Sequence, residues 1–345
     1  MPNVYGLGPA GSSYIISLDD KNIYAYDRYV EKYGRPRSIC AGGLGLPAIK
    51  EMIKYVPVVS NAINHSVKTY VDSVEYIGRD IKVFIEGKHL GLAPYAGVVV
   101  DRTEFDYYLF KEAMKKVDSS KPINDVNIYA IGFEGLLNIN KKDLESLTQI
   151  WVETKDVDTT IRLVYIKNWL ETGYYWEFPE YKNGIIKIGV GASLKELEKK
   201  NITITQLLQK FVEYRGVKGK IIKKAGSMLP LTKFKKEYMF RREGIYIGTA
   251  GGLVNPATGA GIRYAVLSGY AVAKNDYNLL NKLIKEVNRF YIVKKIVEMS
   301  SQKMIDKTIK MLAEEALSGG FDLEDIHGKK NFYKIIKVFL KNIFK

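Results

Sequence analysis

The first thirty residues show a regular succession of apolar and polar runs that predicts alternating strands and helices. Val4 and Tyr5 end a short apolar strand, and a glycine-rich turn then opens a helical run over residues 12–18. A second strand over residues 22–26 ends at an acid, Asp27. A strand, a GxGxxG turn, a helix, a strand and an acid in this order are typical of a dinucleotide-binding unit.

The rest of the chain alternates between strand-like and helix-like patterns. Short alternating strands are predicted over residues 66–87, and several strands over residues 149–190, where Asn183 and Gly184 mark a turn. Further strands are predicted over 126–131 and 244–247, and helices over 102–116, 203–214, 261–273 and throughout the region beyond 276. Sheet segments thus lie between two halves of a nucleotide-binding frame, which indicates interleaved domains rather than sequential ones.

Each glycine of the N-terminal motif has a predicted physical role. Gly6 permits the tight turn, and Gly8 lets the backbone approach a pyrophosphate. Gly11 allows the helix and strand to pack closely, and the helix N-terminus faces the phosphate charge. In such a unit Asp27 is placed to bind the adenosine ribose.

Composition narrows the function classes. The chain has 345 residues, of which 46% are hydrophobic and 26% charged, values typical of a globular protein. Its net charge of +15 comes mainly from lysines spread along the chain, so nucleic acid is not expected as a partner. One cysteine, Cys40, and three distant histidines (His65, His89 and His327) predict no disulfide and no histidine-built metal site. With no signal peptide pattern at its start, we expect a cytoplasmic protein.

Five segments resemble the geranylgeranyl reductase family of flavoproteins, within the wider group shaped like para-hydroxybenzoate hydroxylase. The first is GLGPAGSS at residues 6–13, with Asp27. The others are Cys40–Leu44 (CAGGL), Val100–Asp106 (VDRTEFD), Tyr174–Pro179 (YYWEFP) and Gly248–Gly261 (GTAGGLVNPATGAG). Together they span the chain from residue 1 to about 275 in the order that the family has them. The Y-x-W-x-F-P segment separates prenyl reductases from the hydroxylases.

This resemblance implies a mixed α/β fold, in which a Rossmann-like FAD-binding domain is interleaved with an antiparallel-sheet substrate domain and followed by a helical C-terminus. The FAD-binding domain would comprise residues 1–62, 88–146 and 222–276. The substrate domain would comprise residues 63–87 and 147–221, and the helical region residues 277–345.

The resemblance also implies site residues. Contacts to FAD are expected from Gly6, Gly8, Ala10, Gly11, Asp27, Cys40, Ala41, Gly43, Arg102, Thr249, Gly261 and Ile262. An aromatic wall of Tyr174, Trp176 and Phe178, with Pro179, would line a tunnel for an isoprenoid chain, although such a stripe is also common in ordinary cores. Cys40 would lie near the flavin ring and the alkene, where it assists protonation or shapes the pocket. An ordered water and Tyr174 are the other candidate proton donors.

Three departures from the family pattern bear on the cofactor. Thr249 stands where the family has an aspartate, which weakens an acceptor for a ribityl hydroxyl. Glu134 lengthens the carboxylate of the family's G-A-D-G segment, and the stretch 119–127 is shorter than the meander of relatives. These changes are expected to lower flavin affinity more than to alter the fold.

The implied function is an FAD-dependent reductase that saturates C=C bonds of isoprenoid (geranylgeranyl) chains in membrane-lipid precursors. Another flavin-dependent modifier of a hydrophobic substrate, and a binding protein without catalysis, are the alternatives. The electron donor, ferredoxin or NAD(P)H, is left open because no second GxGxxG is present. The lysine-rich amphipathic segment 330–345 is either a peripheral contact with the inner face of the membrane or a helix packed on its own domain.

Overall fold

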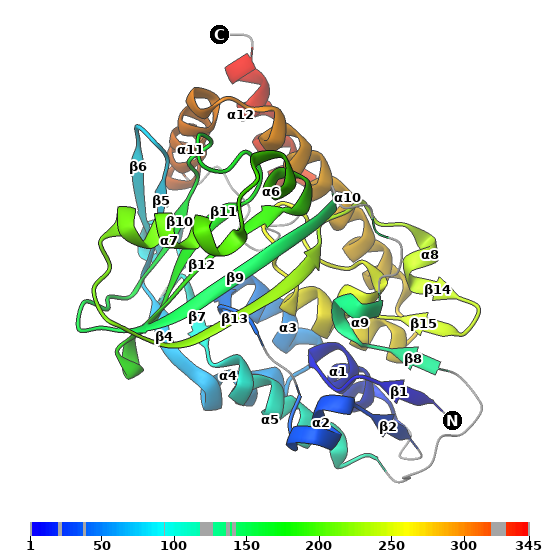
Figure 1. Cartoon of the computed structure of the whole chain (residues 1–345). Coiled ribbons are helices and arrows are strands. Elements are labelled where there is room, and N and C mark those ends of the chain that lie inside the picture. Colours follow the sequence, from blue (N-terminus) through cyan, green and yellow to red (C-terminus); the bar gives the residue numbers. More distant parts are fainter. Residues whose placement is uncertain are drawn as a thin grey trace.

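A computed structural model describes residues 2–19, 23–36, 39–92, 94–117, 127–135, 139, 143–318 and 329–343. Within these residues the strands form three sheets. Figure 1 shows the N-terminal elements at the lower right, a broad sheet across the middle, and the last helices packed above it. The α/β fold expected from the sequence, with a helical C-terminal end, is confirmed.

The N-terminal sheet has the order β14-β15-β8-β1-β2. Its strands are β1 (Asn3–Tyr5), β2 (Tyr24–Tyr26), β8 (Asn127–Tyr129), β14 (Phe240–Arg241) and β15 (Gly244–Tyr246). β1 pairs in parallel with β2 and with β8, as a dinucleotide-binding unit requires. Helix α1 (Pro9–Ser17) begins three residues earlier than expected, because a proline suits the first turn of a helix. Residue 22 of the predicted strand 22–26 and residue 126 of the predicted strand 126–131 lie outside the described residues.

The large sheet has the order β13-β9-β12-β11-β10-β5-β6. Its strands are β5 (Ser73–Ile77), β6 (Lys82–Glu86), β9 (Leu144–Glu153), β10 (Thr160–Val164), β11 (Tyr174–Glu180), β12 (Ile185–Ser193) and β13 (Lys220–Pro230). Helices α6 (Leu194–Lys200) and α7 (Ile204–Arg215) cover one face, where Tyr175, Ile188 and Phe211 are fully buried. The opposite face turns toward the C-terminal helices.

A small sheet, β3-β7-β4, lies between the other two. It consists of β3 (Gly43–Gly45), β4 (Val67–Val71) and β7 (Gly97–Val100). The strands expected over residues 66–87 are present as β4, β5 and β6, but β4 pairs with β7 rather than with β5. Around this sheet lie α2 (Arg28–Tyr33), α3 (Leu46–Tyr55), α4 (Val59–Ser66) and α5 (Arg102–Met114). Phe105 and Leu109 of α5 are fully buried, whereas Met114, at the last turn of the helix, is 37% exposed.

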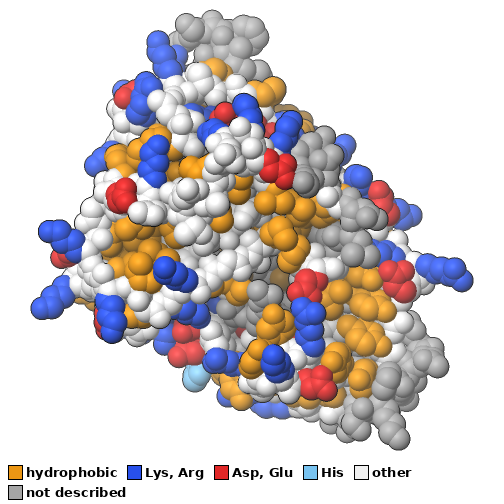
Figure 2. Space-filling model, in the orientation of Figure 1, with side chains coloured by type: hydrophobic (Ala, Val, Ile, Leu, Met, Phe, Trp, Pro, Cys, Tyr) orange, Lys and Arg blue, Asp and Glu red, His pale blue; other side chains and the backbone are white. Residues whose placement is uncertain are grey.

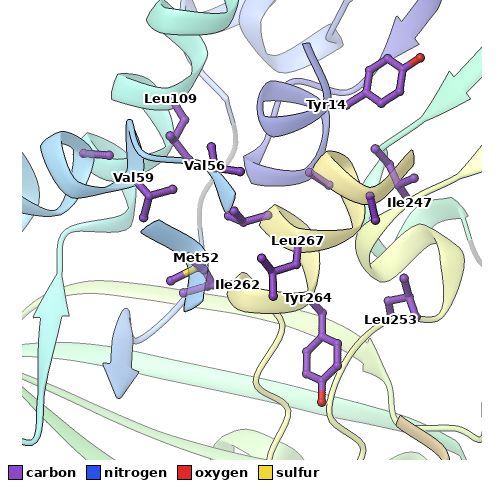
Figure 3. Packing of buried hydrophobic residues seen from close by; sticks show 14 of the residues in the cluster. Tyr14, Met52, Val56, Val59, Leu109, Ile247, Leu253, Ile262, Tyr264 and Leu267 are labelled. Atoms are coloured by element: carbon purple, nitrogen blue, oxygen red, sulfur yellow. The ribbon is translucent and has the colours of Figure 1, made fainter. Parts of the chain in front are cut away.

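One continuous hydrophobic core joins the N-terminal sheet to its helices. Met52 of α3, Leu109 of α5 and Leu267 of α9 (Ile262–Ala273) all belong to it, and Figure 3 shows how these helices contribute side chains to the core. Helices α1 and α9 approach closely because Gly269 has no side chain: a Cβ there would lie 2.4 Å from the carbonyl oxygen of Ala10. The core therefore fixes the N-termini of both helices relative to each other.

The C-terminal part is helical, as predicted, wherever it is described: α10 (Tyr277–Met299), α11 (Gln302–Leu317) and α12 (Lys329–Ile343). On α12, Val338 and Phe339 are buried while Lys330 and Lys337 are exposed. The remaining short elements are α8 (Lys236–Met239), η1 (Gly87–Leu90), η2 (Gly132–Gly135), η4 (Tyr181–Asn183) and η5 (Gly248–Gly251). Figure 2 shows Lys and Arg dispersed over the visible face rather than gathered in one patch. Among the helices described here, none is both long and apolar enough to cross a membrane.

Candidate active site

The glycine turn after β1 has the geometry that a dinucleotide phosphate needs. Gly6 has a φ of +93°, and a Cβ there would lie 2.5 Å from the carbonyl oxygen of Ala130. A Cβ on Gly11 would lie 1.9 Å from the carbonyl oxygen of Gly6, so both positions require glycine. Gly8, by contrast, has no described atom within 4 Å of a Cβ position. It forms the N-cap of α1 without a side-chain cap, so the helix presents free backbone N–H groups to an anion.

Asp27 lies beside this turn, although its carboxylate is already engaged with backbone groups. One oxygen accepts a hydrogen bond from Leu7 N at 2.8 Å. The other accepts from Tyr29 N and Val30 N and so caps α2. Asp27 therefore joins the turn to the second strand and helix, and its predicted contact with a ribose stays a prediction.

A second glycine-rich segment brings another helix N-terminus to the same region. Gly261 is the N-cap of α9 and, like Gly8, has no side-chain cap. The hydroxyl oxygen of Thr249 lies 3.8 Å from the position of a Cβ on Gly261, and Ile262 is buried behind it. Ala10 of α1 is 3.0 Å from a Cβ position on Gly248, which ties the two glycine-rich segments together. The structure thus brings the first and last of the sequence motifs into one place.

The second and third sequence motifs, Cys40–Leu44 and Val100–Asp106, also lie in contact. Arg102 forms two hydrogen bonds to Asp106, at 2.8 and 2.9 Å, across one turn of α5. It also lies close enough to Cys40 to interact with it electrostatically, and the Cys40 sulfur accepts a hydrogen bond from Gly42 N at 3.4 Å. Burial lowers the pKa of Arg102, but the Asp106 carboxylate outweighs it and holds the pKa above its usual value. A fixed cation therefore lies beside Cys40.

A buried lysine that sequence reasoning missed holds the Cys40–Leu44 segment in place. Lys187 of β12 is 2% exposed and lies 2.6 Å from a carboxylate oxygen of Glu180. Its ammonium also donates to the carbonyl oxygens of Ala41, at 3.0 Å, and Val100, at 3.3 Å. The sequence does hold one indication of this contact, a single lysine among the apolar residues of Ile185–Ile188. A lysine in a buried strand requires partners for its charge.

The aromatic residues of β11 divide between two environments. A Cβ on Gly43 would lie 2.1 Å from the ring of Phe178, so Phe178 packs directly on the Cys40–Leu44 segment. Pro179 is buried, and its carbonyl oxygen accepts from the Thr69 hydroxyl at 2.6 Å. Tyr174 and Trp176 lie farther along the same face as Phe178 and contact each other edge to face.

Tyr174 and Trp176 line an apolar cavity of about 430 Å³ between the large sheet and helices α10, α11 and α12. Its walls include Leu147 of β9, the loop 256–259 and side chains of all three helices. Phe178, Pro179 and Cys40 are not among the described lining residues. This volume lies within the range of ligand-binding pockets, about 300–1,000 Å³.

Polar contacts fix the two aromatic side chains that line this cavity. The Tyr174 hydroxyl donates to the carbonyl oxygen of Thr258 at 2.5 Å, which joins the wall to the glycine-rich loop. Trp176 Nε1 donates to Gln149 Oε1 at 2.9 Å, and the indole packs on Gly189. Burial holds the pKa of Tyr174 well above its usual value, so the hydroxyl stays protonated.

A buried carboxyl group, Glu145 of β9, also lines the cavity and was not predicted. Glu145 is 1% exposed, and among the described residues neither of its oxygens has a hydrogen-bond partner. The nearest cation is Lys294 Nζ, 3.5 Å away, which donates its hydrogen bond to the Leu231 carbonyl oxygen instead. Burial raises the pKa of Glu145 more than Lys294 lowers it.

Comparison with solved structures defines the class of fold. A geranylgeranyl bacteriochlorophyll reductase-like protein from Thermoplasma acidophilum has a TM-score of 0.76 and 20% identity, and the match covers 99% of this chain and 97% of that one. A flavin-dependent brominase has a TM-score of 0.64 and 14% identity over 100% and 99% of the two chains. The chain therefore has the fold of flavin-dependent oxidoreductases and halogenases.

Sequence comparison narrows the class further, although no family model matches the chain. The chain is 28% identical over 243 residues to a digeranylgeranylglycerophospholipid reductase of Thermoplasma acidophilum, covering 60% of each. It is 26% identical over 198 residues to the protein of the same name from Thermoplasma volcanium, covering 52% of this chain and 49% of that one. The matches thus span about half to three fifths of the length of these relatives. The resemblance found in the sequence is confirmed: the chain is similar in sequence to digeranylgeranylglycerophospholipid reductases and in fold to a geranylgeranyl bacteriochlorophyll reductase-like protein.

Proposed function

We propose that this protein is an FAD-dependent reductase that saturates C=C bonds in isoprenoid chains of membrane-lipid precursors. The observation that carries the proposal is the apolar cavity, which begins at the glycine-rich loop 256–259 and continues between the large sheet and the C-terminal helices. A hydrocarbon chain fits such walls, because transfer of apolar surface from water is favourable.

The residues present fit an FAD molecule. Gly8 leaves open space at the N-terminus of α1, where the pyrophosphate would lie, with Asp27 within reach of the adenosine ribose. In this proposal the uncapped N-terminus of α9 at Gly261 would stabilise negative charge on the flavin ring, and Arg102 would contact the phosphate–ribityl chain. When bound, FAD supplies hydride chemistry.

The protein's own contribution is positioning. An unactivated alkene develops no oxyanion, so catalysis depends on holding the chain against the cofactor and excluding water. Trp176 is suited to this task because its indole is fixed by Gln149 on one edge and Gly189 on one face. Tyr174 then joins this wall to the loop that faces the cofactor.

The test compares two tryptophans on opposite faces of the large sheet. Trp176 lines the cavity, whereas Trp169 packs edge to face against Tyr175 on the other side. We expect the purified protein to show a flavin spectrum and, once reduced without oxygen, to be reoxidised by geranylgeraniol in micelles. Trp176→Ala should keep its flavin but lose most reoxidation, while Trp169→Ala should lower stability and leave the rate per flavin unchanged.

Two outcomes would reject the proposal. If the purified protein retains no flavin, FAD is not its cofactor. If the two variants have equal rates per flavin, the cavity is not the substrate site. Product formation coupled to oxygen consumption would favour the alternative of a flavin-dependent oxygenating or halogenating enzyme, whose fold is similar.

The partners follow from the same proposal. Ferredoxin or NAD(P)H would reduce the flavin, and peripheral contact with the inner face of the membrane would occur through α12. Because Val338 and Phe339 of α12 are buried, this contact would be electrostatic and involve the exposed Lys330 and Lys337. Co-sedimentation with anionic vesicles should then fall as salt is raised, and binding that is indifferent to salt would exclude this mode.

A further inference from the structure

The buried carboxyl group of Glu145 needs an explanation, because among the described residues it accepts no hydrogen bond and its ion pair with Lys294 is long, at 3.5 Å. A charged carboxylate with no hydrogen-bond partner in an apolar cavity is costly, so such a group is retained in its neutral form or has a specific use. Glu145 is 1% exposed and lines the same cavity as Tyr174 and Trp176.

The strand register places Glu145 close to the aromatic wall. On β9, Glu145 and Leu147 point to the same face, and Leu147 stands opposite Gly191 of β12. Tyr174 of β11 stands opposite the same glycine from the other side. Since Gly191 has no side chain, nothing on β12 separates Tyr174 from the face that carries Glu145.

The charged and titratable groups around Glu145 come from several elements. Lys294 and Glu298 belong to α10, with Lys294 Nζ 3.5 Å from Glu145 and 3.6 Å from Glu298. Tyr174 and Tyr165 line the cavity from β11 and the end of β10, and both phenols have raised pKa values because they are buried. Burial raises the pKa of Glu145, Lys294 lowers it, and Glu298 and, from α6, Glu196 raise it further.

We propose that Glu145 is the acid that donates the proton to the alkene, an inference that rests on the proposed function. The O–H bond of Glu145 breaks, and a C–H bond forms at the less substituted alkene carbon. Hydride from the reduced flavin bonds to the other carbon, so the alkene gains two electrons and the flavin is oxidised. The Glu145 carboxylate then regains its proton from solvent.

Lys294 has a positioning role in this scheme. Its ammonium is held by the Leu231 carbonyl oxygen at 2.9 Å and lies 3.5 Å from Glu145, too long for a strong hydrogen bond. The neutral acid is therefore free to act, while the carboxylate left after proton transfer has a cation beside it. Cys40 is less suited as the donor, because it is absent from the described cavity lining.

The experiment uses Glu145→Gln, with Glu153→Gln as the matched control, because Glu153 is an exposed glutamate of the same strand β9 and is not among the described cavity-lining residues. Both variants should retain flavin and be reduced by dithionite like the natural protein. Reoxidation by geranylgeraniol should fall by about a hundredfold or more in Glu145→Gln, the range for loss of a general acid, and stay within about threefold in Glu153→Gln. In the natural protein the rate should fall as the pH rises through the raised pKa of Glu145.

A readout independent of turnover is the infrared spectrum. The natural protein should show the carbonyl band of a protonated carboxylic acid that shifts in D₂O, and Glu145→Gln should lose it while Glu153→Gln keeps it. Absence of that band near neutral pH, or a Glu145→Gln variant as fast as the natural protein, would overturn the assignment of Glu145 alone. A natural protein that reduces no prenyl lipid would overturn the reductase function and the assignment together.

Discussion

Replacing Lys187 by methionine tests how the two halves of the site are held together. Lys187 is 2% exposed, and its ammonium interacts with Glu180 and with the carbonyl oxygens of Ala41 and Val100. Methionine has a similar length and no charge, so the substitution removes these three interactions with little change in volume. Glu180, itself 3% exposed, keeps only a 3.2 Å hydrogen bond from Asn183 among the described side-chain contacts.

The magnitude follows from leaving a buried charge without its partner. Breaking such a pair by removing one member costs about 3–5 kcal/mol. The two carbonyl groups add a smaller penalty, about 1–3 kcal/mol for each buried acceptor left unsatisfied, which does not sum fully with the first. We therefore expect Lys187→Met to lower the free energy of unfolding by at least about 3 kcal/mol.

Urea denaturation followed by tryptophan fluorescence measures this loss, and flavin content reports on the Cys40–Leu44 segment. The double variant Lys187→Met, Glu180→Gln should recover most of the stability, because no unpaired charge remains. Lys224→Met, on an exposed position of β13, is the matched control and should stay within about 0.5 kcal/mol. A loss below about 1 kcal/mol in Lys187→Met, or no recovery in the double variant, would refute the reasoning.

Three further predictions concern the cofactor and pH. Gly8→Glu places bulk and charge in the open space at α1 and should abolish flavin retention; a folded, fully yellow variant would contradict the phosphate site. Thr249→Asp should tighten flavin binding by about 0.5–1.5 kcal/mol, measured by titration, and unchanged or weaker binding would count against the family-like geometry. Burial raises the pKa of Glu51, but ion pairs with Arg263 and Lys282 outweigh it, so the folded-state pKa is lowered. Its stabilisation is present above the pKa of the unfolded chain and is lost as the pH falls through the folded-state pKa, so Glu51→Gln should destabilise at neutral pH and become neutral in acid. A penalty that does not depend on pH would show that the ion pairs are not its cause.

Local patterns in the sequence predicted the parts of the fold that local physics controls. The turn at Gly6–Gly11 and the helix over residues 203–214 were both predicted from local patterns and are present, the helix as α7. The strand β13 was missed, because a register shift between Ile221 and Lys223 interrupts its alternation and its first residues are exposed lysines and isoleucines. A bulge of this kind removes the period that identifies a strand.

The residues missed at the site have long-range partners. Lys187 contacts Ala41, which lies 146 positions away in sequence, and Glu145 lies beside Lys294 of the C-terminal helices. Nothing in the neighbouring residues of either side chain specifies such a partner. Sequence reasoning therefore found the motifs around the cofactor but not the charged groups that join them to the cavity.

The strand order of the N-terminal sheet has a consequence for biosynthesis. β1 is flanked by β2 and β8, but β15, which pairs with the outer edge of β8, is not translated until residue 246 has been added. At about 5–20 residues per second, the edge of β8 emerges on the order of ten seconds before its partner. An uncovered strand edge can pair with another nascent chain. The strand β5 waits a shorter time for its parallel partner β10, because fewer residues separate these two strands. Slowing of ribosomes between residues 129 and 244 should therefore favour aggregation over folding, and a chaperone that shields strand edges should act on this chain while it is still attached to the ribosome.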